Sequence, residues 1–302
     1  MYAFHRLRAT HVYFYKSCNF LKIELLKIFQ TAPFSRSSQN CIVNGIQCSN
    51  EPWVVEIIVL HRQKWKHLCG GTLIHPNWVV TAAHSFFHPG KENQPFAPKN
   101  AYKVCIGSPK LCSGIQYNIS AIHHPSFEIT WDRKLVLNDL ALIKLPLSIP
   151  DHLASPIPLA TNSKECYVNR TGYIFGWGAT TKNERDINDF SPYLQKGSVT
   201  IADNSQCSDI TARLDDGKIC IDCDQSPSVA CNGDSGGPLV VKQENGRFVL
   251  IGISSYGDRN YENWDIYTRI TAHLEWIHHI IKFHDVELFM NDQKNLIDTS
   301  LD

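Results

Sequence analysis

Three polar residues that lie far apart in the chain are of the types that together activate a hydroxyl group. Ser235 lies in residues 233–238 (GDSGGP), where its glycine neighbours permit a tight turn with backbone N–H groups pointing at a substrate. His84 ends residues 81–84 (TAAH), and Asp139 precedes an apolar run. A serine hydroxyl is a weak nucleophile near neutral pH, so it needs an adjacent base, and the base needs an orienting carboxylate. Together the three residues indicate nucleophilic acyl transfer.

Each of the three also has a simpler interpretation. An isolated histidine such as His84 is more often a hydrogen-bonded core residue, and an isolated Asp139 is more often a turn or cap residue. A serine between glycines, such as Ser235, can be part of a turn and nothing more. However, the order His, Asp, Ser is one of the known chain orders of a Ser-His-Asp triad. Because all three occur together with strand-like flanking segments, the joint chemical interpretation is favoured.

The elements that must position these residues are short strands. Apolar runs recur between Gly, Pro and Asn clusters from Ile42 onward. We expect strands at residues 54–60, 72–74, 79–80, 141–145, 173–175, 239–241 and 249–254. Residues 272–283 carry apolar residues at helical spacing, and the proline-containing segment 146–158 is a candidate link between two halves. Many short strands and one long helix predict an all-β barrel or sandwich.

Composition narrows the classes of function. The chain has 302 residues, of which 43% are apolar, so it can build a sizeable core. Lys plus Arg and Asp plus Glu both number 29, so the formal net charge is zero and there is no whole-chain field for nucleic acid or anionic membrane. No segment reaches the roughly 18 apolar residues of a membrane span. We therefore expect no nucleic-acid partner and no membrane span.

Cysteine usage points to an oxidising compartment. There are eleven cysteines, an odd number, so at least one has no disulfide partner within the chain. Asn118 and Asn169 begin N-glycosylation sequons, which agrees with export. Residues 1–41 do not form a clear signal peptide, because charged residues interrupt their apolar stretches. A secreted, extracellular location is therefore expected from the cysteines rather than from the leader.

Further motifs give the chain a specific resemblance. The segments at 42–45 (IVNG), 69–74 (CGGTLI), 78–84 (WVVTAAH), 139–142 (DLAL), 176–178 (GWG), 233–238 (GDSGGP) and 267–269 (YTR) resemble, in this order, the signature blocks of trypsin-like serine endopeptidases. The resemblance implies two packed six-stranded antiparallel β-barrels with a C-terminal α-helix and a catalytic cleft between the barrels. It predicts a leader or propeptide at 1–41, a peptidase domain at 42–284 and a polar tail at 285–302. It also implies a protein or peptide substrate, and a protease inhibitor as a further partner.

The resemblance implies a role for each matching residue. His84 would act as general base and then general acid, Asp139 would hold its tautomer and stabilise the imidazolium, and Ser235 would attack the peptide carbonyl. The N–H groups of Gly233 and Ser235 would form the oxyanion hole. Ser255 matches the serine that supports the triad carboxylate. The product would be an acyl-enzyme that water then hydrolyses.

Substrate binding is implied in the same way. The substrate backbone would lie along Ser255, Tyr256 and Gly257. Val229 stands at the floor of the specificity pocket, where trypsin has an aspartate, and Ala230 beside it is apolar. Asp265 stands at a wall position that is usually glycine, and a buried aspartate there needs water, a partner or a substrate cation. With Gly257 keeping the entrance open, we expect a hydrophobic or mixed preference that admits basic residues.

The activation site departs from the family pattern. In the family, cleavage creates a new N-terminus whose ammonium pairs with a buried aspartate beside the nucleophile; Ile42 and Asp234 match these two positions. Cys41 stands where the family has Lys or Arg, and cutting after Arg36, the nearest upstream basic residue, would leave five extra residues. This departure keeps an alternative open, in which the chain is a catalytically silent homologue that acts as a protein-binding module.

The resemblance also implies one disulfide and no bound metal. Cys207 and Cys220 match a family pair, whereas Cys105 with Cys112, and Cys223 with Cys231, are alternatives left open by the sequence. A zinc or redox role for the spacing between Cys220 and Cys223 conflicts with that disulfide. Residues 91–94 carry a single acid where family calcium loops have several. We therefore expect no metal and no cofactor.

Overall fold

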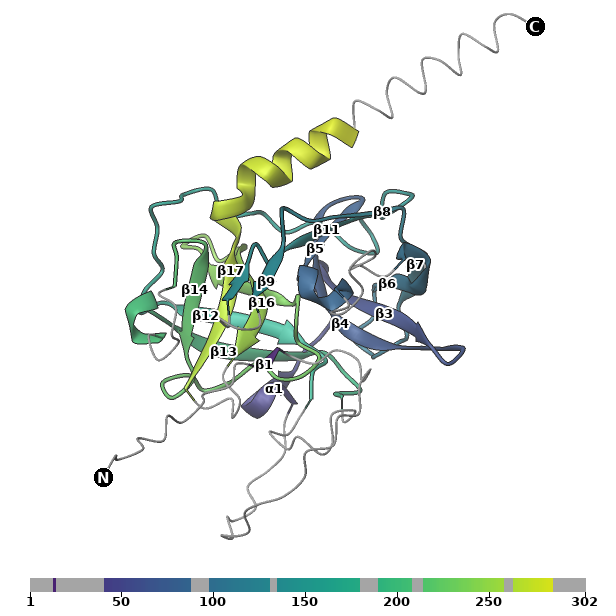
Figure 1. The fold of residues 1–302 in the computed structure, drawn as a ribbon. Helices are drawn as coiled ribbons and strands as arrows, with labels where there is room; N and C mark the ends of the chain where they lie inside the picture. The colour runs from purple at the N-terminus through teal and green to yellow at the C-terminus, as the bar shows by residue number, and fades with distance from the viewer. Residues whose placement is uncertain are drawn as a thin grey trace, which may run out of the picture.

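The computed structural model of the chain describes residues 13–14, 41–87, 98–130, 135–179, 190–207, 214–257 and 263–284. Two β-sheets that lie side by side make up most of it (Figure 1). The expected leader lies outside the described residues except for 13–14 and 41, and the expected tail at 285–302 lies wholly outside them. Along the described chain, no helix combines the length and the apolar character needed to cross a bilayer.

The first sheet forms the half of the molecule that carries His84 and Asp139. Its strands follow the order β7-β6-β3-β4-β5-β11-β8 and are all antiparallel. Their bounds are β3 Val54–His61, β4 Lys64–His75, β5 Trp78–Thr81, β6 Tyr102–Ile106, β7 Ile115–Asn118, β8 Ala121–His123 and β11 Ala141–Lys144. Alternate residues of β3, such as Val55 and Ile57, enter the core of this half. A separate hairpin pairs β9 (Glu128–Thr130) with β10 (Leu135–Leu137).

The second sheet closes on itself and carries Ser235 in one of its connections. The path β16-β15-β12-β13-β14-β17 is completed by pairing of β16 with β17, which gives a six-stranded barrel. Its strands are β12 Thr171–Gly176, β13 Gln195–Ala202, β14 Lys218–Asp222, β15 Pro238–Lys242, β16 Phe248–Gly257 and β17 Trp264–Arg269. Two short strands extend it: β1 (Tyr13–Phe14) pairs with β16, and β2 (Ile46–Gln47) pairs with β13.

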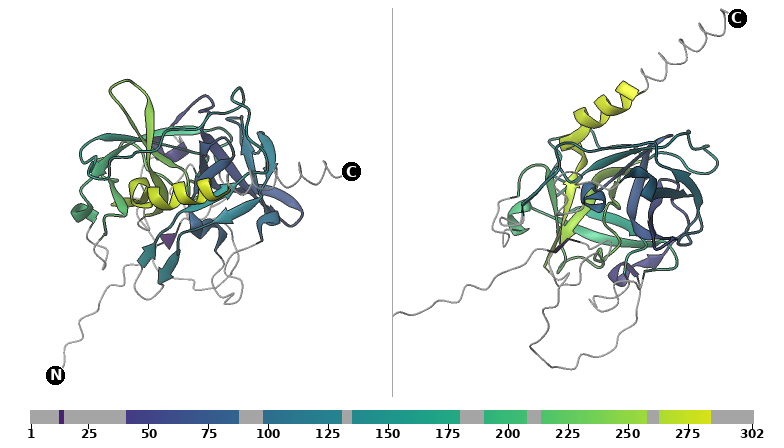
Figure 2. Two further views of the ribbon diagram at one scale, coloured as in Figure 1. Left: turned by 90° about the horizontal axis from the view of Figure 1, so that it is seen from above. Right: turned by 45° about the vertical axis from the view of Figure 1, so that its right-hand side comes forward.

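Along the described residues the helices are short, apart from the one at the C-terminal side. The short ones are α1 Cys41–Asn44 and the 3-10 turns η1 Ala83–Phe86, η2 Lys99–Ala101, η4 Asn204–Cys207 and η5 Ile270–His273. Residues 274–284 then form the expected long helix, which runs from the second half toward the first when seen from above (Figure 2). All seven expected strands are present, and the segment 146–158 joins β11 of the first sheet to β12 of the second, as expected. The all-β architecture with a C-terminal helix is confirmed.

An apolar cluster joins the two halves and fixes their relative placement. Trp78, Val80 and Leu142 of the first sheet pack with Phe175 and Trp177, on or just after β12 of the second, in one buried cluster. Burial of apolar area is the main stabilising term in folding, at roughly 25 cal/mol per Å². Because this cluster spans the boundary between the sheets, residues from both halves can be held at fixed positions in a shared site.

The described cysteines include one bridged pair and several thiols that range from buried to exposed. The expected disulfide between Cys207 and Cys220 is present and ties η4 to β14. The alternative bridge between Cys105 and Cys112 is wrong, because both residues are thiols. The Cys112 thiol donates to Glu56 Oε1 at 3.4 Å instead. Burial, followed by the nearby Glu56 carboxylate, raises the pKa of each of these two thiols to about 12, so neither is a reactive thiolate at neutral pH.

Candidate active site

His84 and Asp139 meet at the ends of two paired strands. β5 and β11 are antiparallel, with Thr81 opposite Ala141, so the residues just after β5 and just before β11 lie beside each other. The His84 Nδ1 atom lies 2.7 Å from Asp139 Oδ2, and the His84 backbone N–H donates to Asp139 Oδ1 at 2.9 Å. Two bonds to one carboxylate fix both the position of the histidine backbone and the direction of its ring.

Asp139 is completely buried and yet is held as a carboxylate. Ser255 Oγ donates to Asp139 Oδ2 at 2.5 Å, and Thr268 Oγ1 donates to the Asp139 carbonyl at 2.9 Å. Burial alone would raise the pKa of Asp139, but the charge of His84 and the hydrogen bonds from His84 and Ser255 outweigh it and lower that pKa below its ordinary value. A carboxylate in this state favours a proton on the facing nitrogen of His84.

Ser235 lies in a turn that is pressed against the strand leading to His84. Gly236 adopts φ 73°, and a Cβ there would lie only 2.1 Å from Thr81 Oγ1 and 2.6 Å from the Gly70 carbonyl oxygen. The Gly70 N–H in turn donates to the Ser235 carbonyl at 2.9 Å. Only glycine combines this positive φ with so close an approach. The second half therefore brings its serine to the edge of the first half where His84 lies.

The Ser235 hydroxyl is buried and makes no hydrogen bond to any described residue. The structure thus joins His84 to Asp139 and brings the Ser235 turn against the same strand, without a hydrogen bond at the serine itself. Contacts between a catalytic serine and its base are often loose without substrate and tighten when substrate binds.

The expected substrate-backbone segment forms the last residues of β16. Within this segment Ser255 is buried, and its hydroxyl donates a hydrogen bond to Asp139. The outer edge at Tyr256 and Gly257 is paired antiparallel with the chain's own Phe14 and Tyr13, which form β1. An extended segment of this chain therefore occupies the edge to which a substrate backbone is expected to add as a strand.

The sequence of this chain is similar to those of known proteins. The family model described as Trypsin matches residues 42–277. The chain belongs to the trypsin family.

Individual relatives agree with this assignment. Urokinase-type plasminogen activator of Gallus gallus is 32% identical over 78% of this chain, but the match spans only 56% of that protein. Chymotrypsin-C of Bos taurus is 30% identical, with 75% of this chain and 82% of that protein covered. Tryptase of Mus musculus is 30% identical, with 85% and 94% covered. As a trypsin-family member, the chain is of the serine-protease type.

The residues expected to line the specificity pocket are buried in the second half. Gly257 of β16 lies directly opposite Asp265 of β17 in the strand register. Asp265 is 1% exposed, and after burial itself its negative charge is the next cause of the strongly raised pKa of Tyr267. Val229 and Ala230 are buried in the segment just before the serine turn. Gly257 and Asp265 are thus neighbours on paired strands, whereas Val229 and Ala230 come from a separate segment.

The expected activation pair is only half assembled. Ile42 is buried and lines the same small cavity as Asp234, but its nitrogen is peptide-bonded to Cys41 within α1 and carries no ammonium. Burial raises the pKa of Asp234 to about 6, although N–H groups of Cys231 and Gly178, at 2.9 and 2.8 Å, and the nearby His67 act against this rise. Ile42 also has φ 42°, a costly conformation for a β-branched residue. The site holds a buried acid that lacks its cation.

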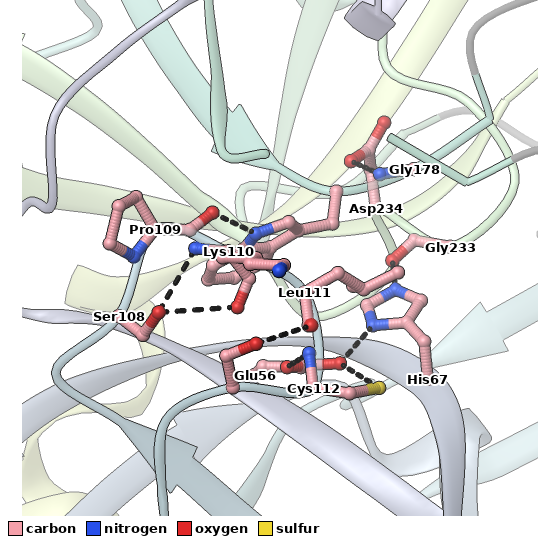
Figure 3. Close-up of polar contacts among 12 residues, drawn as sticks. Glu56, His67, Ser108, Pro109, Lys110, Leu111, Cys112, Gly178, Gly233 and Asp234 are labelled. Carbon is pink, nitrogen blue, oxygen red and sulfur yellow. Dashed lines mark hydrogen bonds and ion pairs between the residues drawn. The ribbon is translucent and has the colours of Figure 1, made fainter. Parts of the chain in front are cut away.

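Two residues that the sequence analysis did not single out belong to the same site. His67 Nε2 lies 3.1 Å from the Gly233 carbonyl oxygen, and His67 Nδ1 lies 3.1 Å from Glu56 Oε1 (Figure 3). Glu56 is 2% exposed in the middle of an otherwise apolar strand. One acid inside an apolar run such as 54–60 is a signal that could have drawn attention to it, since buried acids need partners.

Proposed function

We propose that the chain is a serine endopeptidase that hydrolyses peptide bonds through an acyl-enzyme. The observation that carries the proposal is the 2.7 Å contact between His84 and the buried Asp139, reinforced by Ser255 and placed beside the Ser235 turn. A histidine fixed by a carboxylate next to a serine is the arrangement that turns a hydroxyl into a nucleophile. The peptidase domain would comprise residues 42–284, with 1–41 as propeptide and 285–302 as an appended tail.

The reaction follows from these positions. Ser235 Oγ attacks the carbonyl carbon of the scissile bond while its proton passes to His84 Nε2, and Asp139 stabilises the imidazolium. The N–H groups of Gly233 and Ser235 bind the oxygen that becomes negative. His84 then gives the proton to the leaving amine, the C–N bond breaks, and an ester to Ser235 remains. Water repeats the sequence, which releases the acid product and restores the hydroxyl.

The substrate would be a protein or peptide whose backbone pairs with Tyr256 and Gly257. That edge already accepts an extended strand, β1, which supports its use by a substrate or by a protease inhibitor. Apolar Val229 and Ala230 favour a hydrophobic or mixed side chain before the cut bond. Asp265 would additionally accept a basic side chain, because a carboxylate in a buried site gains most from a cationic partner.

Activation would occur by cleavage before Ile42. The new ammonium would find Asp234 across the cavity that both residues already line, and would relieve the positive φ of Ile42. The chain would therefore be made as a zymogen. Export to an extracellular compartment fits the disulfide and the two sequons, whose residues Asn118 and Asn169 are both exposed for glycosylation.

A second candidate is a catalytically silent homologue that binds proteins. Three observations favour it: Cys41 rather than a basic residue precedes Ile42, the Ser235 hydroxyl makes no hydrogen bond to described residues, and β1 covers the substrate edge. In that case the same edge would bind a partner strand without cleavage.

Serine-directed labelling of a correctly processed chain distinguishes the two candidates. A site for a specific protease, placed so that the cut leaves Ile42 first, gives a defined N-terminus. We expect a fluorophosphonate to label this form at Ser235 and a peptide library to be hydrolysed, with Ser235→Ala inactive in both assays. If the processed chain and the alanine variant label equally, the endopeptidase proposal fails and the binding role remains.

A further inference from the structure

We propose that His123 and His284 form a binding site for a divalent transition-metal ion such as Zn²⁺. The inference goes beyond the proposed function and does not depend on it, because neither histidine belongs to the expected triad or pocket. His123 is the last residue of β8 in the first half, and His284 lies at the end of the C-terminal helix at 274–284. The two residues are 161 positions apart in the chain, so only the fold brings them together.

The distance between the two histidines is that of two ligands of one ion. Nε2 of His123 lies 3.0 Å from Nε2 of His284. At a metal–nitrogen distance of about 2.0–2.1 Å, two ligand nitrogens lie about 2.9 Å apart at a right angle and about 3.3 Å apart in a tetrahedral site. The observed separation lies between these values, so one ion can bond to both nitrogens with little movement of either ring.

The two rings meet at their edges. Their centroids are 4.8 Å apart and their planes are tilted by 57°, so the rings are not stacked. Because the Nε2 atoms are closer to each other than the centroids are, these nitrogens lie on the facing edges. The lone pair of an imidazole nitrogen lies in the plane of the ring, so ligands of one ion have to meet in this way.

A hydrogen bond between the rings is the simpler explanation of the contact. It requires a proton on one Nε2 and a lone pair on the other. A metal ion takes the place of that proton and uses the lone pairs of both nitrogens, since neutral imidazole is the form that binds. The hydrogen bond therefore holds the metal-free pair at the separation that an ion needs.

The surroundings give the pair a fixed wall and an open side. The ring of the buried Trp78 lies beside both histidines, with centroids at 5.8 Å from His123 and 5.4 Å from His284. His123 is opposite Leu142, which holds β8 against β11. Both histidines are half-buried, so water can reach the ion and fill its remaining positions.

The ligand type decides the class of ion. Imidazole suits Zn²⁺, Cu²⁺ and Ni²⁺, whereas Ca²⁺ and Mg²⁺ prefer oxygen ligands. Lys144 Nζ lies 5.6 Å from the centroid of the Trp78 ring, and its positive charge opposes an ion held by charge alone. Among the described residues, no group of three or more His, Cys, Asp and Glu side chains could hold a metal ion, so this site has two protein ligands and water. The proposal departs from the expectation of no metal, because its two ligands come from distant segments.

A bound ion would join the C-terminal helix to the first half. The helix runs from the second half toward the first (Figure 2). The ion needs His123 and His284 at the same time, so it binds the docked helix and not a helix that has moved away from β8. Saturation should therefore hold residues 274–284 in place.

Titration of the full chain with Zn²⁺ tests the inference, after alkylation of the accessible thiols, because thiolates also bind this ion. We expect calorimetry to show a Zn²⁺ site that His123→Phe and His284→Phe each weaken by about tenfold or more, while phenylalanine keeps an aromatic ring beside Trp78. The double variant H123F/H284F should lose little more than either single variant, because both residues serve one ion. Mg²⁺ should not bind at this site.

A control variant and a second measurement locate the ion. His279→Phe removes an exposed histidine of the same helix and should leave binding unchanged. In wild type, the Nε2 resonances of His123 and His284 should shift together on addition of Zn²⁺, a test that needs no substitution. Amide exchange in residues 274–284 should slow roughly tenfold in wild type and not in H123F. Wild-type affinity in H123F or H284F would overturn the inference, and so would loss of the site in His84→Phe alone, which would place the ion at the triad.

Discussion

The two buried aspartates on either side of Ser235 have opposite electrostatic surroundings. Asp139 is deprived of water, but His84 and Ser255 compensate, and its pKa is lowered. Asp234 is equally buried and accepts two backbone N–H bonds, yet its pKa is raised to about 6. Burial is the largest influence on both, and it raises both pKa values. The difference lies in the partners: the side chains of His84 and Ser255 hydrogen-bond to Asp139, whereas backbone N–H groups bind Asp234.

The comparison shows which part of the site is complete in the uncut chain. The contact between His84 and Asp139 is already formed, and Ser255 donates a further hydrogen bond to Asp139. The Asp234 side holds a carboxylate at the place where an ammonium would be strongly favoured. The described structure thus has the contact between His84 and Asp139 in place and no ammonium beside Asp234, and four changes, taken from the largest expected effect to the smallest, would break or sharpen this contrast.

Loss of the nucleophile should have the largest effect. Ser235→Ala in the processed chain should lower kcat by roughly 10⁶-fold, because the members of a triad act as a unit. His84→Ala should give a loss of similar size. His75→Ala, which removes a histidine whose Nδ1 lies 2.8 Å from Oδ1 of the nearby Asn77, is the control and should retain activity. Hydrolysis of a fluorogenic peptide, normalised to folded protein, makes the comparison; residual activity in S235A close to wild type would exclude Ser235 as the nucleophile.

Removing the charge of Asp139 should come next. Asp139→Asn keeps the size of the side chain but no longer favours the correct tautomer of His84, so kcat should fall about 10⁴-fold. The exposed Asp203→Asn should have no comparable effect. The measurement is kcat at neutral pH with the active-site concentration known. A loss below tenfold would mean that the contact between Asp139 and His84 does not direct the histidine.

Neutralising Asp234 should remove a pH dependence of the unfolding free energy of the uncut chain. Since its folded pKa is about 6 against an ordinary 3.8, its contribution to stability is fully present below pH 3.8 and is lost as pH rises through about 6. The difference in unfolding free energy between wild type and Asp234→Asn should therefore change by about 2.4 kcal/mol between pH 4 and pH 7.5, in favour of the variant at the higher pH. Denaturant titrations at both pH values measure it.

The matched control for that prediction is the exposed Asp151→Asn, which should follow wild type across the whole range. In chain cut before Ile42, the new ammonium should reverse the behaviour of wild type, because a paired carboxylate stabilises the fold at neutral pH. An unchanged pH dependence in D234N would mean that Asp234 is already paired in the uncut chain.

The smallest effect is expected from loss of the hydrogen bond that Ser255 donates to Asp139. Ser255→Ala removes the 2.5 Å bond to Asp139 Oδ2, a hydrogen bond to a charged group of a kind that contributes about 1.5–3 kcal/mol, so kcat should fall by roughly tenfold or somewhat more. Because Ser255 lowers the pKa of Asp139, the acid side of the rate profile should also move to higher pH. Ser226→Ala, whose hydroxyl donates to the Asp222 carbonyl, should alter neither the rate nor the profile.

Sequence patterns predicted the strands well where apolar residues alternate or run together. They did not predict that β4 begins as early as Lys64, because that part of the strand carries charged residues and is held by pairing with β3. The contact between His84 and Asp139 was predicted by motif, and the register of β5 and β11 produces it. The pairing of Glu56 with His67 depends on a bulge and on contacts across the two halves, which no local pattern specifies. The thiols of Cys105 and Cys112 were misjudged because closeness in sequence says nothing of side-chain direction.

The strand β1 has a consequence for how the substrate edge would be used. Tyr13 and Phe14 occupy the backbone positions beside Gly257 and Tyr256 while covalently attached to the same chain. A tethered competitor has a local concentration set by its linker, which is typically millimolar, and diluting the protein does not lower it. A peptide that pairs with this edge from solution must therefore displace a segment whose local concentration does not fall on dilution.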